Sequence, residues 1–196
     1  MRSPRLSLPL PLLAALLVAG SAAHAQNAAP ASAAPAASTS SLKAEIVAQI
    51  DEAGSKLVQL AEATPQDKFA YRPAAGVRST SEVFMHVVGA NYMLPGIAGT
   101  PKPTDVKLTP DMEKTVTGKA QIVELLRKSF AHARAAAMGL PDDQMDARVN
   151  LFGEQATKRA VLLLIATHAH EHLGQSIAYA RASGVVPPWS RGQAGN

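Results

Sequence analysis

The sequence predicts an all-α protein folded as one four-helix bundle, with a long crossover connection between its second and third helices. Three observations support this fold class. Four long segments repeat apolar residues with the helical period of about 3.6 residues, no stretch alternates convincingly as a β-strand, and the second connection is longer than a simple hairpin needs. The alternative is that this connection forms a lid over one end of the bundle. In either arrangement, facing helices can supply side chains to a site in the core.

The N-terminal segment has the features of a secretory signal peptide. Residues 1–25 contain two arginines, then an apolar run, then the cleavage pattern Ala23-His24-Ala25. Two prolines interrupt the apolar run, which is shorter than the ~20 residues of a membrane-spanning helix, so a membrane anchor is the weaker interpretation. We expect cleavage after Ala25 and a protein that is periplasmic or secreted, without a membrane anchor.

The rest of the chain divides into three parts by composition. Residues 26–41 are almost entirely Ala, Ser, Pro and Thr, which predicts a flexible linker because such residues bury too little apolar surface to fold. Residues 42–189 have the composition of one folded domain of ordinary size. Residues 190–196 are expected to be a disordered tail.

The composition excludes several functions. The chain has no cysteine, so disulfides, thiolate chemistry and Cys-type zinc sites are absent, and any metal must be bound by nitrogen and oxygen. Loss of residues 1–25 removes two arginines and no acid, which lowers the formal charge from +4 to +2. With few aromatic residues besides, the chain shows no patch suited to nucleic acid, and the expected partner is a small molecule.

The first two helices have clear boundaries in the sequence. The first is expected over 41–64, where apolar residues share one stripe, and Pro65 ends it. The second opens with the capping box STSE at Ser79 and runs to Leu94, where a Pro-Gly pair follows. The long connection, PGIAGTPKPTDVKLTPDMEKTV, then precedes the third helix.

The third and fourth helices are also amphipathic. The third is expected to begin near Thr117 and to end near Gly139. The fourth runs from about Thr157 to Gly184, a glycine suited to the position just after a helix. This last helix contains the most unusual stretch of the chain.

That stretch, ATHAHEHLGQ at 166–175, contains half of the six histidines of the chain. His168 and His172 lie about 40° apart on the helix face that should point into the core, whereas His170 should point away into solvent. Two imidazoles at this spacing form half of a site for a divalent cation. The spacing alone leaves an alternative open, in which both are hydrogen-bonded histidines at one end of the bundle.

A metal site needs a third ligand, and two histidines compete for this role. His86 shares a face of the second helix with apolar residues, and His132 lies toward the edge of the apolar stripe of the third helix. Spacing favours His86 only modestly. HAHEH also satisfies the zinc-protease pattern H-x-x-E-H, but no acidic residue follows Glu171 to complete that site.

Three stretches together resemble the DinB family of DinB/YfiT-like metalloenzymes, across about 42–189. They are KFAYRPAAGVRSTSEVFMHVVGAN, THAHEHLGQSIAYARASG and GVVPPWSR. The resemblance implies a four-helix bundle with a long second connection and a three-histidine site for a divalent ion such as nickel or zinc. Carried over to this chain, the implied ligands are His86, His168 and His172. Many members have His-His-Arg-Gly-Gln where this chain has Glu171-His172-Leu173-Gly174-Gln175, which puts the roles of the replaced residues in doubt.

The expected function is that of a metal-dependent enzyme, of hydrolase type, acting on an unidentified small molecule. Three histidine ligands leave coordination positions open, and a cation lowers the pKa of bound water toward ~7. Glu171 flanks the histidine pair and is the candidate catalytic residue, either accepting a proton or hydrogen-bonding a ligand imidazole, with an exposed surface acid as the alternative.

Three other functions stay open at this stage. One is a non-catalytic protein that binds a metal or a small molecule, and another is a purely structural histidine cluster. A thiol-dependent transferase is disfavoured, because an exported protein meets few low-molecular-weight thiols. A homodimer is possible by analogy with related bundles.

Overall fold

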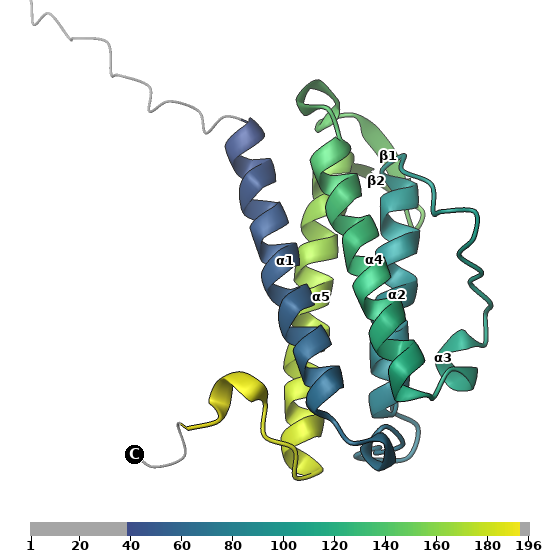
Figure 1. The fold of residues 1–196 in the computed structure, drawn as a ribbon. Coiled ribbons are helices and arrows are strands. Elements are labelled where there is room, and N and C mark those ends of the chain that lie inside the picture. Colours follow the sequence, from purple (N-terminus) through teal and green to yellow (C-terminus); the bar gives the residue numbers. More distant parts are fainter. Residues whose placement is uncertain (1–38, 193–196) are drawn as a thin grey trace, which may run out of the picture. The chain divides into compact units, whose positions relative to one another are not determined.

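The computed structural model describes residues 39–192, and four long helices dominate it (Figure 1). The all-α class and the four-helix bundle are therefore confirmed. The long helices are α1 (Thr39–Ala63), α2 (Thr80–Ile97), α4 (Lys119–Gly139) and α5 (Lys158–Ala182). The predicted signal peptide at 1–25, most of the linker and the last four residues of the tail lie outside the described residues.

The order of the helices around the bundle explains the long connection. α1 and α2 each pack against both α4 and α5, so α1 and α2 occupy opposite corners. Figure 1 shows that α2 and α4, although neighbours, run in the same direction. The chain must therefore return along the bundle between them, which makes residues 98–118 a crossover. This segment contains the short helix α3 (Met112–Thr115).

Apolar side chains from all four long helices meet in one core. Ile50 and Leu57 of α1, Phe84 of α2, Leu126 of α4 and Ile165 of α5 are each at most 1% exposed. Complete burial of one such side chain stabilises a fold by about 1.5–3 kcal/mol. The predicted apolar stripes thus face inward, and they fix which face of each helix points to the interior.

The boundaries of α2 differ in one respect from the prediction. The capping box is confirmed, since the Ser79 side chain accepts from the Glu82 backbone and the Glu82 side chain accepts from the Ser79 backbone. The helix does not end at Leu94, however, but continues through Pro95 to Ile97. A proline in the last turn removes a single backbone hydrogen bond and its φ angle is already helical, so the helix can continue past it.

The expectation that the chain contains no strand was wrong. β1 (Arg148–Leu151) and β2 (Glu154–Thr157) form a two-stranded antiparallel hairpin between α4 and α5. Each strand has only four residues, too few for a visible alternation. The turn at Phe152-Gly153 has positive φ at both residues, 55° and 98°, a conformation for which Asn-Gly is the usual signal.

No helix within residues 39–192 combines the length and apolar character needed to cross a bilayer.

Candidate metal centre

Three histidines from two helices meet at one point of the bundle. His86 comes from α2, and His168 and His172 lie one turn apart on α5, which packs beside α2. One ring nitrogen from each histidine lies within 4.8 Å of the other two. The ring centroids are 4.4 to 5.1 Å apart. The structure therefore brings together the three residues that the resemblance implied.

Glu113 sets the orientation of the His86 ring. His86 Nδ1–H donates to Glu113 Oε1 at 2.8 Å, and Arg78 Nε–H donates to Glu113 Oε2 at 2.9 Å. Burial would raise the pKa of Glu113, but the hydrogen bonds from Arg78 and His86 outweigh it and hold the pKa below its ordinary value. An ionised carboxylate can only accept, so His86 carries its proton on Nδ1 and Nε2 is left free.

A second hydrogen-bonded chain orients His172. Gln175 Nε2–H donates to Tyr179 Oη at 3.1 Å, which turns the amide oxygen of Gln175 toward His172. That oxygen lies 2.8 Å from His172 Nδ1 and accepts its proton. His172 therefore also keeps Nε2 free. Both supporting residues lie on α5, one and two turns beyond the histidine pair.

Burial holds two of the histidines, His168 and His172, in the neutral form that metal ligation requires. Burial, followed by the repulsion of positive charge on His172 and His86, lowers the pKa of His168 to about 4. Burial is also the main cause of the lowered pKa of His172, although the hydrogen bond to Gln175 opposes it. Neutral imidazoles offer lone pairs to a cation at ordinary pH.

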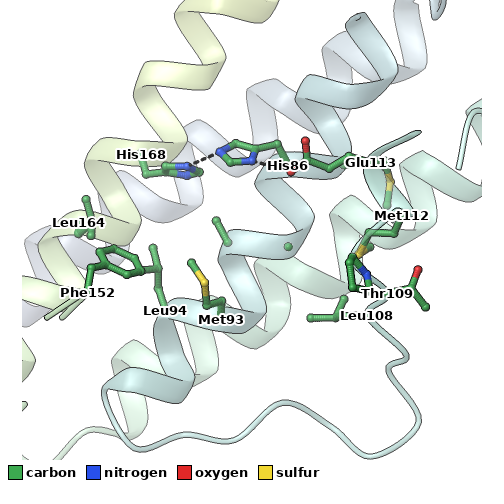
Figure 2. Close-up of a pocket in the computed structure, with 14 residues that line it drawn as sticks. His86, Met93, Leu94, Leu108, Thr109, Met112, Glu113, Phe152, Leu164 and His168 are labelled. Carbon is green, nitrogen blue, oxygen red and sulfur yellow. Dashed lines mark hydrogen bonds and ion pairs between the residues drawn. The ribbon is translucent and has the colours of Figure 1, made fainter. Parts of the chain in front are cut away.

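The donor set fits a divalent cation. His168 Nε2 and His86 Nε2 lie 3.2 Å apart. The two rings point toward one another, and a dashed line marks this contact in Figure 2. Two lone-pair nitrogens this close repel one another unless a proton or a cation lies between them. Three imidazole nitrogens with no thiolate suit zinc or nickel. His86, His168 and His172 can therefore hold such an ion.

The centre opens onto a cavity of about 610 Å3. His86, His168 and Glu113 form its polar wall, and most of the remaining lining is apolar (Figure 2). A volume of this size is typical of small-molecule sites. His86 and His168 thus lie where a bound molecule could reach them, with the buried His172 directly behind them.

Comparison with known proteins shows the family of this chain. The family model of the DinB superfamily matches residues 49–176 of this chain. The chain belongs to the DinB superfamily. The chain is similar to the protein YjoA of Bacillus subtilis (strain 168). The two sequences are 27% identical over 132 aligned residues, which cover 64% of this chain and 80% of YjoA.

Two solved structures share the DinB fold. A DinB-like protein from Bacillus cereus ATCC 10987 superposes with a TM-score of 0.64 at 17% identity, covering 73% of this chain and 93% of that one. The DinB-like YjoA from Bacillus subtilis gives a TM-score of 0.58 at 23% identity, covering 72% and 93%. At these identities the likeness concerns the fold alone.

Two other histidines of this DinB chain lie outside the centre. His132, the competing third ligand, stacks on Tyr92 with ring centroids 5.2 Å apart. His170 points away from the triad as predicted, but it is half-buried rather than solvated, and among the described residues its buried Nε2 has no hydrogen-bond partner. A positive charge on His170 would lower the pKa of Glu52 of α1, so the ring lies on the side of α5 that faces α1.

Glu171, the predicted catalytic residue, is exposed on α5. Within residues 39–192 it forms no hydrogen bond with the three histidines, and its negative charge acts to raise the pKa of His172. Its predicted role therefore stays a prediction.

The sequence did not reveal the residues that support the histidines. Gln175 belongs to the Gly-Gln pair of the resemblance, but nothing there assigned it to His172. Glu113 lies in the crossover, where no helical period predicts what a side chain faces, and Arg78 precedes the cap of α2. Their contacts depend on the folded path of the crossover.

The low pKa of His168 predicts a pH-dependent stability in metal-free protein. In the unfolded chain this imidazole titrates near its ordinary 6.5, and in the folded chain near 4, so the unfolded state binds more protons between these values. The contribution of His168 to the free energy of unfolding is expected to be fully present above about pH 6.5. It should be lost as the pH falls toward 4. Urea unfolding of chelator-treated protein measures it, and His168→Gln should show a shallower decline. Equal slopes in both proteins would contradict the prediction.

Proposed function

We propose that this DinB-superfamily protein is a metal-dependent enzyme that uses water to cleave a small molecule, in the manner of a hydrolase. One observation carries the proposal: three imidazoles converge within 4.8 Å, and two of them, His86 and His168, line a cavity of about 610 Å3. A divalent ion, zinc or nickel, bound there would supply Lewis-acid activation of water at near-neutral pH.

The chain's own residues have separate tasks in this proposal. His86, His168 and His172 hold the ion, and Glu113 and Gln175 fix the ring orientations of two of them. Orientation by such partners keeps the ligating nitrogens aimed at one point and raises their basicity. The cavity binds the substrate and limits the access of bulk water.

Two carboxylates are available to move protons. Glu113 is ionised and lines the cavity, but it already accepts hydrogen bonds from Arg78 and His86. Glu171 is exposed, lies next to His172 on α5, and has no such partner among the described residues. We assign proton transfer to Glu171, as the sequence suggested.

The proposal is tested with protein purified without a histidine tag. We expect about one divalent ion per chain by elemental analysis. We also expect turnover in a panel of esters, amides and lactones that a chelator abolishes and added zinc or nickel restores. Bound metal without turnover on any of these would favour a non-catalytic binding protein, which the apolar cavity also suits. Absence of stoichiometric metal would overturn the proposal.

We also propose that the protein is exported to the periplasm or beyond, on the basis of residues 1–25 alone. N-terminal sequencing of protein recovered from the cell envelope is expected to begin at Gln26. As a control, Ala25→Asp should block cleavage, since the site requires a small residue there. An intact Met1 on the wild-type product would contradict the proposal.

A further inference from the structure

We propose that the metal centre acts on an uncharged, largely apolar molecule that presents one polar group to the histidines, and that Gly89 and Phe152 shape its binding site. The chemistry at the histidines rests on the proposed function. The binding of such a molecule does not, because the apolar lining of the cavity comes from the side chains of the chain itself.

Most of the cavity lining is apolar, and its polar side chains are those of His86, His168, Glu113 and, on the crossover, Thr109. Figure 2 shows His86, His168 and Glu113 at one end, with apolar side chains from α2, the crossover and α5 around the rest. The main apolar contributors are Met85, Met93, Leu94, Leu108, Met112 and Leu164. A ligand with an apolar body and one polar group therefore matches the site, since its polar group can meet the histidines.

The charge of the lining disfavours an ionic ligand. No lysine or arginine is among the residues that form the cavity in the described part of the chain. The one carboxylate, Glu113, is already matched by Arg78. A charged group that enters an apolar site without a partner loses its hydration, which is costly. The ligand is therefore uncharged.

Phe152 takes an unfavourable backbone conformation at the rim of this cavity. Its φ angle is 55°, in the left-handed region, and it is the only such residue other than glycine in the described chain. The turn geometry favours asparagine at this position, and a bulky residue there is strained. The side chain is 66% exposed, so packing within the protein does not explain the choice. Figure 2 shows the ring beside Leu164 and Leu94, where it can cover a bound molecule.

Gly89 is a second residue that weakens its own element and lines the same cavity. It lies in the middle of α2, where glycine is destabilising relative to alanine. A methyl group added there would meet no atom outside its helix within 4 Å, so it would enter open space. Gly54 of α1 differs, because an added methyl would lie 2.7 Å from the Phe130 ring. Close packing therefore explains Gly54, whereas Gly89 leaves volume open in the cavity.

Two local departures from stable structure thus meet at one cavity, and neither improves the packing of the fold. Departures of this kind are expected where a site is retained for a ligand. A glycine widens the cavity from α2 and an aromatic ring covers it from the hairpin. Substitution of either residue is therefore expected to weaken ligand binding without lowering the stability of the fold.

The test uses two dyes that differ in charge. N-phenyl-1-naphthylamine is uncharged and apolar with one N–H group, and 8-anilinonaphthalene-1-sulfonate adds a sulfonate to the same rings. In fluorescence titrations of the zinc-loaded and the chelator-treated protein, we expect the uncharged dye to bind at least about tenfold more tightly, since the sulfonate must be desolvated.

Two substitutions test the residues, each with a matched control. Gly89→Leu should abolish binding of the uncharged dye, and Phe152→Asn should weaken it about tenfold through lost apolar contact. Both variants should melt at or above the wild-type temperature, because leucine favours the helix and asparagine the turn. The controls are Gly139→Leu at the end of α4 and Val186→Asn in an exposed loop, and both should leave binding unchanged.

Specific outcomes would overturn the inference. Equal or tighter binding of the sulfonate would show that the site takes anions, and normal dye binding by Gly89→Leu would show that the dye lies elsewhere. A lower melting temperature of Phe152→Asn would show that this ring serves the fold. If the dyes behave as expected but the protein holds no metal, the proposed function fails and the ligand class stands. If metal binds but the uncharged dye does not, the proposed ligand class fails and the proposed function stands.

Discussion

Replacing His168 with alanine is expected to abolish stoichiometric metal binding, and His86→Ala and His172→Ala are expected to do the same. The three ring nitrogens lie within 4.8 Å of one another, and no fourth His, Asp or Glu in the described chain belongs to that group. With one imidazole missing, only two protein ligands remain, which is fewer than zinc sites use. Elemental analysis of tag-free protein after dialysis measures the loss.

His170→Ala and His132→Ala are the controls for these variants. His170 lies on the same helix but on the side that faces α1, and His132 stacks on Tyr92. Both variants should keep full metal content. If His170→Ala lost metal as completely as His168→Ala, the assignment of the α5 faces would be wrong.

Glu113→Gln is expected to weaken metal binding by about 10- to 100-fold, the range found when a hydrogen-bond partner of a metal-ligating histidine is removed. The amide has no negative charge, so it no longer stabilises a proton on His86 Nδ1, and it leaves Arg78 without its ion pair. Competition with a chromophoric chelator gives the affinity. An unchanged affinity would mean that the contact does not support His86.

Glu171→Gln is the matched control, because it makes the same change in an exposed carboxylate next to His172. Its metal affinity should equal that of the wild type. Unchanged metal with strongly reduced turnover would support proton transfer by Glu171, whereas weakened metal would indicate a hydrogen bond to a ligand imidazole. If neither property changes, Glu171 is a surface residue without a functional role.

The sequence predicts what depends on one helix at a time. The capping box at Ser79 is local, and a period of about 3.6 residues decides which face of α5 is buried. For that reason His168 and His172 could be placed on one inward face before the fold was known. His86 needed the family resemblance, because spacing on separate helices does not say which faces meet.

The sequence could not predict contacts set by irregular chain. Glu113 reaches His86 only because the crossover runs beside α2. The hairpin turn at Phe152 lacks the residue that normally marks its type. His170 was expected in solvent because it points away from the other two histidines of α5, but its ring is half-buried and lies near Glu52 of α1.

The residues of the metal centre lie on segments that differ in local stability, because Glu113 lies on the crossover and the three histidines lie on long helices. Between 98 and 118 only Ala98 and Met112 are buried, whereas each of the four long helices contributes many side chains to the core. Segments with few buried contacts open at a small fraction of the free energy of global unfolding. Glu113 lies on such a segment, while His86, His168 and His172 lie on the most stable elements. Local opening of the crossover therefore withdraws the proton acceptor from His86 while the three ligands stay in place, so affinity for the cation and cooperative unfolding of the bundle can vary independently.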